Sequence, residues 1–439
     1  MTSGGTSEMT PEMPPEADPL PRLAPILRAA AARFGTPVQV TDAVALEAAA
    51  ASVRAAFPDP WLRAFSVKAN DVAGIVARVT SLGFGANVVS RGEWAVARRA
   101  GVPNDRVTLE GVGKSDGDLR AACRAAADGA PVRWIAIESL DEAEALVAVA
   151  SRSLGRGGAA RLDVLFRLNP EVTPETHHGL AVGAATSKFG MTADELSAAV
   201  EVVERTSGLV PRGIQLHVGS QLGAVDAWRE SVRRGLALLA LLGGTRGEFD
   251  TLDVGGGFPV LPLGEAAPGP ARFARELQAL IDAIPADRRP GRLAIEPGRA
   301  LVARAGFLLA RVLHVRERGG RQIVLDAGMT ELIRPALYDA VHGIDALTSL
   351  GRAVDAAGAA QDLEPARVEG PICESTDHLG DHRFPSLRRG DLVAIRDAGA
   401  YAASLASTYN GRPRPPQVIA EPDGSLTLAR RRGSLASLG

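Results

Sequence analysis

The chain has 439 residues, enough for two domains with separate hydrophobic cores. Its hydrophobic fraction of 46% and charged fraction of 23% are typical of a globular protein. The formal net charge of −2, without any run of basic residues, argues against a nucleic-acid partner. No apolar stretch is long enough to span a bilayer, so we expect no membrane partner either.

Residues 1–20 are rich in Pro, Glu, Ser and Thr, which predicts a flexible tail. The tail lacks a basic segment followed by an apolar one, so we do not expect it to act as a secretory signal. The two cysteines, Cys123 and Cys373, do not make a disulfide framework, so we expect a cytoplasmic protein. Of 49 basic residues only three are lysines, Lys68, Lys114 and Lys188, and only lysine can act as an amine nucleophile.

Eight short β-like runs lie between residues 60 and 300. They are Ala64–Ala69, Gly85–Ser90, Val107–Gly111, Trp134–Ser139, Leu162–Asn169, Gly213–Ser220, Phe249–Gly257 and Arg292–Gly298. Segments with helical spacing separate them, among them Gly92–Ala100, Leu140–Ser151, Ala193–Thr206, Trp228–Leu242 and Ala271–Ile284. This alternation predicts parallel strands, and eight units fit an α/β fold of the (β/α)8 TIM-like barrel type. An open doubly wound sheet shows the same alternation.

After Arg299 the pattern changes to short β-like runs separated by Gly and Pro. They are Ala300–Val315, Gln322–Ala327, Arg367–Ile372, Asp391–Asp397 and Gln417–Ala420. We therefore predict a C-terminal β-rich domain, like a sandwich or barrel, which also takes a strand from Pro37–Val40. The predicted division is a barrel over 43–299 and a β-rich domain formed by 21–42 with 300–439, and a loop is predicted at Ala353–Gln361.

Functional residues of a barrel gather at the carboxyl ends of its strands. Lys68 ends the first predicted strand, where a desolvated amine can form a Schiff base, although a lone lysine there is more often solvent-exposed. His217, in HVGSQ, can stack on an aromatic ring, or it is a core histidine. Gly255–Gly257 can bring backbone N–H groups to an anion, or they form a tight turn.

Two nucleotide-binding motifs are excluded by their spacing. Val260 stands where a dinucleotide-binding motif needs its last glycine. Thr108 stands where a P-loop that contains Gly113 and Lys114 needs its first glycine.

At the last predicted strand end, Glu296 can keep a pyridine nitrogen protonated, and Arg299 can bind a carboxylate in bidentate fashion. The alternative is an internal Glu–Arg pair.

Motifs of the β-rich region add Arg334, Tyr338, Cys373, Glu374 and Tyr401. The ordered set FSVKAN, GVGKSD, RLNPEV, SKFG, HVGSQ, DVGGGFP, EPGR, IRPALY, GPICES and GAYAASLASTYNGRPRP covers roughly residues 25–420. With this set the chain resembles the fold-type III decarboxylases that depend on pyridoxal 5′-phosphate (PLP), and most of all the diaminopimelate decarboxylases.

The resemblance implies a carboxy-lyase that converts meso-2,6-diaminopimelate into L-lysine and CO2, the last step of lysine biosynthesis. It also implies the roles of individual residues. Lys68 would hold PLP as a Schiff base, and His217 would stack on the ring. Cofactor contacts would come from Ser220, Gly255, Gly256, Gly257, Glu296, Pro297, Gly298, Arg299 and Tyr401.

The resemblance assigns substrate binding to Arg299, Arg334, Tyr338, Glu374 and Tyr401, and proton donation to Cys373. It further implies a homodimer in which Cys373 and Glu374 reach the partner's site. No metal is expected.

Three alternatives stay open. They are a decarboxylase of ornithine, arginine, lysine or a D-amino acid, a racemase, and a non-catalytic PLP-binding protein.

Overall fold

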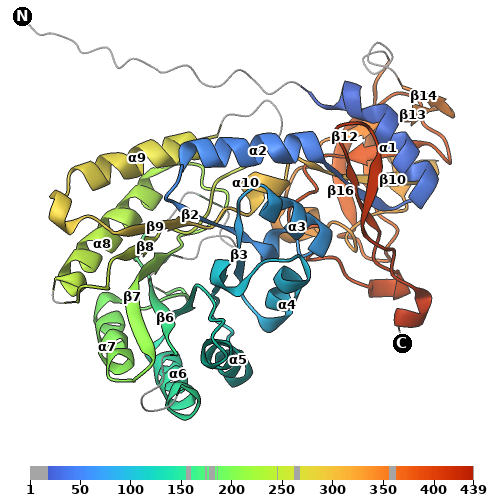
Figure 1. The fold of residues 1–439 in the computed structure, drawn as a ribbon. Coiled ribbons are helices and arrows are strands. Elements are labelled where there is room, and N and C mark those ends of the chain that lie inside the picture. Colours follow the sequence, from blue (N-terminus) through green and yellow to red (C-terminus); the bar gives the residue numbers. More distant parts are fainter. Residues whose placement is uncertain are drawn as a thin grey trace, which may run out of the picture.

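The protein is described by a computed structural model that places residues 18–154, 160–173, 176, 183–184, 186–244, 246–261, 267–354 and 362–438. A barrel and a second sheet-rich region lie side by side, with the barrel in blue to yellow and the second region mostly in orange and red (Figure 1). Within the described residues, none of the helices combines the length and apolar character needed to cross a membrane.

Eight parallel strands form the closed barrel, which confirms the α/β barrel prediction. They are β2 (Leu62–Ser66), β3 (Gly85–Val88), β4 (Val107–Leu109), β5 (Trp134–Ile137), β6 (Leu162–Leu168), β7 (Leu209–Leu216), β8 (Thr251–Asp253) and β9 (Arg292–Ile295). Closure comes from pairing of the first and last strands, with Leu62 beside Ala294. Each of the eight predicted runs overlaps one of these strands.

Helices surround the barrel (Figure 1). They are α2 (Ala43–Ala56), α3 (Ala73–Ser81), α4 (Arg91–Arg99), α5 (Asp116–Ala127), α6 (Leu140–Ser153), α7 (Ala193–Glu204), α8 (Asp226–Gly243) and α9 (Pro270–Asp282). In α9, Phe273, Leu277 and Ile281 are buried, at the spacing that places one apolar stripe toward the strands. Side chains cap several helix starts: Ser90 and Ser139 each accept a backbone N–H three residues later.

The second sheet has the order β16-β15-β11-β10-β1-β18-β19, and β17 joins β10 to β12. Its strands are β1 (Val38–Asp42), β10 (Gly306–Glu317), β11 (Arg321–Leu325), β12 (Ile344–Ala346), β15 (Glu364–Glu369), β16 (His378–Phe384), β17 (Leu392–Ile395), β18 (Gln417–Ala420) and β19 (Leu426–Arg430). A separate hairpin pairs β13 (Thr348–Ser349) with β14 (Arg352–Ala353). Because β1 lies between β10 and β18, the predicted N-terminal strand in this sheet is confirmed.

Two details differ from the predictions. The run Ala300–Val315 is not one strand, because its first residues belong to the short helix α10 (Arg299–Val302). The predicted tail 1–20 lies outside the described residues up to position 17, and helix α1 (Leu20–Phe34) begins at its end, burying Leu23 and Leu27 against the second sheet. Of the predicted loop Ala353–Gln361, residues 355–361 lie outside the described part.

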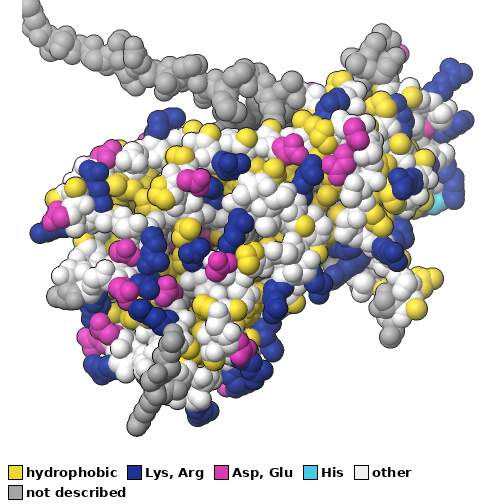
Figure 2. Space-filling model, viewed as in Figure 1, with side chains coloured by type: hydrophobic (Ala, Val, Ile, Leu, Met, Phe, Trp, Pro, Cys, Tyr) yellow, Lys and Arg dark blue, Asp and Glu magenta, His cyan; other side chains and the backbone are white. Residues whose placement is uncertain are grey.

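Hydrogen bonds join the sheet-rich region to the mouth of the barrel. The backbone N–H of Tyr401 donates to the carbonyl of Ala69 at 2.7 Å, and the hydroxyl of Ser404 donates to the carbonyl of Lys68 at 2.8 Å. The segment after β2 is therefore held by the second region. On the face shown in Figure 2, basic and acidic side chains are interspersed over the barrel helices.

Candidate active site

Lys68 follows β2 in a single 3-10 turn, Val67–Ala69, and its side chain is half-buried. Its ammonium influences the pKa values of Glu93, His217 and Glu296, so these groups surround it. The backbone bonds from the second region fix this turn in place. The predicted position of Lys68 at the mouth of the barrel is therefore the one that the structure has.

His217 directly follows β7 and is half-buried. Burial lowers the pKa of its imidazole well below the usual range, and the positive charges of Lys68 and Arg167 lower it further. Its Nδ1 accepts a long hydrogen bond from the backbone N–H of Gly256, at 3.4 Å. The ring is thus neutral with its proton on Nε2, a state suited to stacking on an electron-poor aromatic ring.

The loop Gly255–Gly257 after β8 passes so close to other backbone that only glycine fits. Gly255 has φ of +68°, and a Cβ there would lie 2.2 Å from the carbonyl oxygen of Leu216. A Cβ on Gly256 would lie 2.4 Å from the carbonyl oxygen of Glu296. The N–H of Gly255 donates to Asp253 Oδ1 at 2.9 Å and that of Gly256 to His217, so the loop is held close to both side chains, and its lack of Cβ atoms allows an anion to approach the backbone.

Three buried carboxyl groups, Glu110, Asp253 and Glu296, form the acidic cluster. Oxygen atoms of all three lie within 4.8 Å of one another. Burial and mutual repulsion raise the pKa values of Asp253 and Glu296 to about 8 and that of Glu110 well above its usual range. Gln215 Nε2 donates to Glu296 Oε1 at 3.2 Å, while Glu110 Oε1 and Asp253 Oδ2 each find no hydrogen-bond partner among the described residues.

Such a cluster fits a cation, because uncompensated buried carboxylates are costly. A protonated ring nitrogen meets this need, and a carboxylate facing such a nitrogen is what Glu296 was predicted to supply. Carboxylates in this arrangement also suit a metal ion. The expectation of no metal therefore remains a prediction.

Two buried guanidinium groups, Arg299 and Arg334, form the arginine pair. Arg299 Nη2 donates to the hydroxyl of Ser220 at 3.1 Å, and its guanidinium lies 4.7 Å from the ring centroid of Tyr401. Its Nε has no hydrogen-bond partner in the described part of the chain. Arg334 begins helix α11 (Arg334–Tyr338). Burial, and then the positive charge of Arg299, lower the pKa of Arg334 to about 10. Tyr338 contributes to the electrostatics of both arginines.

Pro297 and Gly298 connect β9 to Arg299 and pack on the turn of Lys68. The backbone N–H of Ser66 donates to the carbonyl of Pro297 at 3.1 Å. A Cβ on Gly298 would lie 3.1 Å from the Cβ of Ser66. The two strand ends are thus in direct contact.

Cys373 and Glu374 lie apart from these groups and are exposed. Tyr409 Oη donates to Glu374 Oε1 at 2.7 Å, and Asn410 Nδ2 donates to Cys373 Sγ at 3.3 Å. In the described part of the chain their contacts run to this segment and not to Lys68. One chain therefore does not bring all the predicted site residues together.

Sequence reasoning missed several polar residues of the site: Glu110, Gln215, Asp253, Arg167, Glu138 and His342. Asp253 stands two residues before Gly255 of the glycine loop, and a carboxylate at the end of a barrel strand was the signal that could have revealed it. Gln215 pairs in register with Asp253 on one side and Arg167 on the other. Their side chains meet inside the barrel because of this register, which the sequence does not contain.

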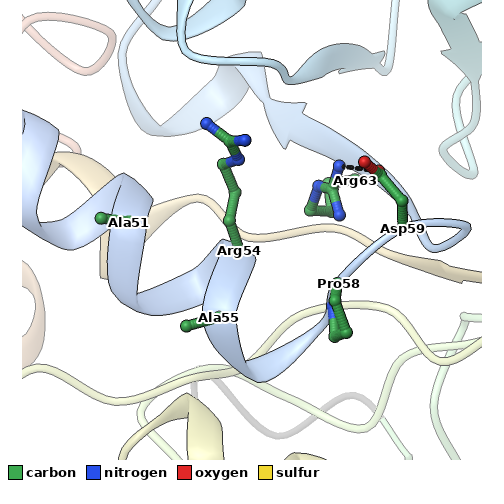
Figure 3. A pocket seen from close by; sticks show the side chains of 6 residues that line it. All are labelled: Ala51, Arg54, Ala55, Pro58, Asp59 and Arg63. Atoms are coloured by element: carbon green, nitrogen blue, oxygen red, sulfur yellow. Dashed lines mark hydrogen bonds and ion pairs between the residues drawn. The ribbon is translucent and has the colours of Figure 1, made fainter.

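A hollow of about 320 Å³ lies at the other end of the barrel, between α2 and β2 (Figure 3). It is lined by Ala51, Arg54, Ala55, Pro58, Asp59 and Arg63. Arg63 is already bound by Asp59 and by the carbonyl of Phe57. The hollow is at the amino-terminal side of β2, whereas barrel sites lie at the carboxyl ends, so it is not the candidate active site.

Comparisons with known proteins agree with this geometry. The pyridoxal binding domain of the pyridoxal-dependent decarboxylases matches residues 44–303. Diaminopimelate decarboxylase of Aquifex aeolicus is 33% identical over 411 residues, with 92% of this chain and 91% of the relative covered. The enzyme of Actinosynnema pretiosum is 38% identical, with 92% and 87% covered.

Solved structures agree as well. Helicobacter pylori diaminopimelate decarboxylase complexed with L-lysine is similar with a TM-score of 0.83 and 29% identity, covering 94% of this chain and 98% of that one. A lysine/ornithine decarboxylase of Vibrio vulnificus, at 22% identity and a TM-score of 0.74 over 92% and 98% of the two chains, shares the fold. This chain is a carboxy-lyase that belongs to the pyridoxal-dependent decarboxylases, in the family of the diaminopimelate decarboxylases.

Proposed function

We propose that the protein removes CO2 from meso-2,6-diaminopimelate and releases L-lysine, with PLP as its cofactor. The observation that carries the proposal is the presence of two sets of buried like charges at one barrel mouth. The acidic cluster suits a protonated ring, and the arginine pair suits a substrate with a carboxylate at each end. The relatives named diaminopimelate decarboxylase support the same assignment.

The residues of the mouth would hold PLP. The Gly255–Gly257 loop and Ser220 would bind its phosphate, Tyr401 would add to that contact, and His217 would stack on the ring. When bound, PLP supplies an electron sink for the pair left at Cα as CO2 departs. Glu296 would hold a proton at the ring nitrogen, and its raised pKa of about 8 reflects the charge that this cation would offset.

Substrate orientation would come from the arginine pair and Tyr338. Arg299 and Arg334 are buried, so a carboxylate bound to them is shielded from water and its hydrogen bonds are strong. An ornithine or arginine substrate would leave one guanidinium without a counter-charge. This argues against a monocarboxylate substrate. The acidic cluster at the ring position argues against a racemase, and Cys373 with Glu374 argue against a non-catalytic role.

The substrate class is tested with a panel of meso-diaminopimelate, ornithine, lysine, arginine and D-amino acids, with CO2 release as the readout. We expect meso-diaminopimelate to be turned over with a kcat/KM at least about 100-fold above the others, since unpaired buried charges cost several kcal/mol. Equal or better turnover of a monocarboxylate amino acid would overturn the assignment.

A homodimer with composite sites is the second part of the proposal. Cys373 and Glu374 would reach the partner's barrel, where Glu374 binds the distal ammonium group and Cys373 donates a proton to Cα. Their exposure, and their contacts with Tyr409 and Asn410 instead of the barrel mouth, support this. The free Cys373 thiol fits a reducing compartment, and we propose a cytoplasmic location.

Complementation tests the composite site. A Lys68→Arg protein and a protein with Cys373→Ala and Glu374→Ala should each be inactive. After mixing and subunit exchange, half of the dimers are mixed and each has one intact site, so about a quarter of wild-type activity should return. If both halves of the site lie in one chain, mixing restores no activity.

We also propose the domain boundaries predicted from the sequence, with a barrel over 43–299 and a β-rich domain formed by 21–42 with 300–439.

A further inference from the structure

His342 lies between α11 and β12 and is 1% exposed. Both of its ring nitrogens have partners. Nε2 is 2.9 Å from Nη1 of Arg334, and Nδ1 is 2.8 Å from the carbonyl oxygen of Arg396. A buried histidine thus connects one member of the arginine pair to the backbone of the second sheet.

The partners permit only one protonation state of His342. A guanidinium N–H can only donate and a carbonyl oxygen can only accept, so Nε2 is the acceptor and Nδ1 carries the proton. Burial and the positive charges of Arg334, Arg299 and His382 lower the pKa of the imidazole to about 4, although the Arg396 carbonyl raises it. The imidazole is neutral.

The anchor of this contact is rigid. Arg396 follows β17, and its backbone N–H donates to the carbonyl of Gly343 at 2.8 Å. The guanidinium of Arg396 is bound by Asp345 of β12 at 2.5 Å and by Asp18 at 2.7 Å. The carbonyl that receives His342 is therefore fixed to two paired strands.

We infer that His342 is the positioning residue of Arg334, holding its guanidinium through a neutral acceptor so that the remaining N–H groups stay available for a substrate carboxylate. The inference rests on the proposed function, in which Arg334 binds such a carboxylate. A carboxylate at position 342 would also fix the arginine, but it would neutralise the charge and occupy its bidentate edge. An imidazole orients Arg334 and leaves the charge intact.

Two conservative variants separate the two hydrogen bonds of His342. The amide oxygen of Gln reaches the place of Nε2, so His342→Gln keeps an acceptor for Arg334. The shorter His342→Asn reaches only the place of Nδ1 and keeps the bond to the Arg396 carbonyl. Both variants are polar and similar in size, so loss of packing affects them to a similar degree.

The readouts are KM and kcat for meso-diaminopimelate, the affinity for L-lysine by calorimetry, and the affinity for PLP. We expect His342→Asn to raise KM by about 10- to 100-fold, the effect of one charge-assisted hydrogen bond, with a smaller change in kcat and unchanged PLP affinity. His342→Gln should stay within about three-fold of the wild type. Equal KM values for the two variants, or a loss of PLP affinity in His342→Asn, would overturn the inference.

An Arg334→Lys protein distinguishes this inference from the proposed function. If Arg334→Lys leaves KM unchanged, the substrate role of Arg334 is wrong and the inference falls with it. If Arg334→Lys raises KM and His342→Asn does not, only the positioning role of His342 is wrong. Should His342→Asn fail to fold, His342→Ser, which also has no acceptor at the place of Nε2, is measured alone and together with Arg334→Lys. A raised KM for His342→Ser that adds nothing to the KM of Arg334→Lys supports the coupling, and an unchanged KM or an added, independent loss contradicts it.

Discussion

The acidic cluster and the arginine pair are two buried sets of like charge with opposite sign. Glu110, Asp253 and Glu296 come from the ends of barrel strands, whereas Arg299 and Arg334 begin short helices at the boundary with the second region. In both sets burial favours the neutral form of the side chain. It therefore raises the pKa values of the acids and lowers those of the arginines.

Other buried charges of the barrel are paired within the protein. Arg167 donates to Glu138 at 2.9 Å, and Lys114 lies 2.8 Å from Glu142. The contrast shows that the fold can pair its charges, whereas no ion pair of the acidic cluster or the arginine pair is found among the described residues, although the charge of Asp397 acts on Arg334. Gathering like charges in this way is unfavourable for the empty protein, and under the proposed function a ligand group of the opposite sign would complete each set.

Lys68→Arg tests whether a positive charge beside the acidic cluster is sufficient for activity. The variant keeps a cation there but removes the amine nucleophile, so we expect activity to fall to background. Cofactor should no longer remain on the protein after borohydride reduction, as measured by mass spectrometry. Lys188→Arg, at an exposed lysine, is the control and should behave as the wild type. Retention of attached cofactor in Lys68→Arg would contradict the site.

Glu296→Gln removes one negative charge from the acidic cluster while keeping the shape of the side chain. We expect kcat to fall by about 10²- to 10³-fold, the usual effect of removing one preorganised charged group. KM should change little, because the arginine pair is untouched. Glu144→Gln, at an exposed helix position, is the control. A large rise in KM with normal kcat would show that the acidic cluster acts in substrate binding and not in the chemical step.

Arg334→Lys gives the opposite pattern. A lysine keeps the charge but loses the planar, bidentate donor edge, so we expect KM for meso-diaminopimelate to rise by about 10- to 100-fold with a smaller loss of kcat. Steady-state kinetics with both variants show whether binding and chemistry are separated. Arg367→Lys, at an exposed position of β15, is the control.

Much of this arrangement was predictable from sequence. The barrel followed from eight apolar runs, and the positions of Lys68, His217 and the glycine loop followed from strand ends. Glu110 and Gln215 were not predictable, because their proximity to Glu296 depends on how strands β4, β7 and β9 face one another across the closed barrel. The contact of His342 with Arg334 depends in the same way on tertiary packing.

The stability of the cofactor-free protein should also report on the acidic cluster. Asp253 and Glu296 have pKa values of about 8 in the folded chain and roughly 4 in an unfolded one, so the folded state binds more protons between these values. Their contribution to the free energy of unfolding is present below about pH 4 and is lost as the pH rises toward about 8.

Glu110→Gln removes one of the repelling carboxylates, and its advantage over the wild type should therefore grow from pH 5 to pH 8. We expect a difference in Tm of a few degrees at pH 8, since about 1 kcal/mol shifts a domain of this kind by roughly 2–4 °C. Thermal unfolding with and without PLP is the measurement, and bound PLP should shrink the difference because its cation offsets the same charge. A Glu110→Gln protein whose Tm difference is constant with pH would show that the cluster is already compensated within the chain, as the pairs Glu138–Arg167 and Lys114–Glu142 are.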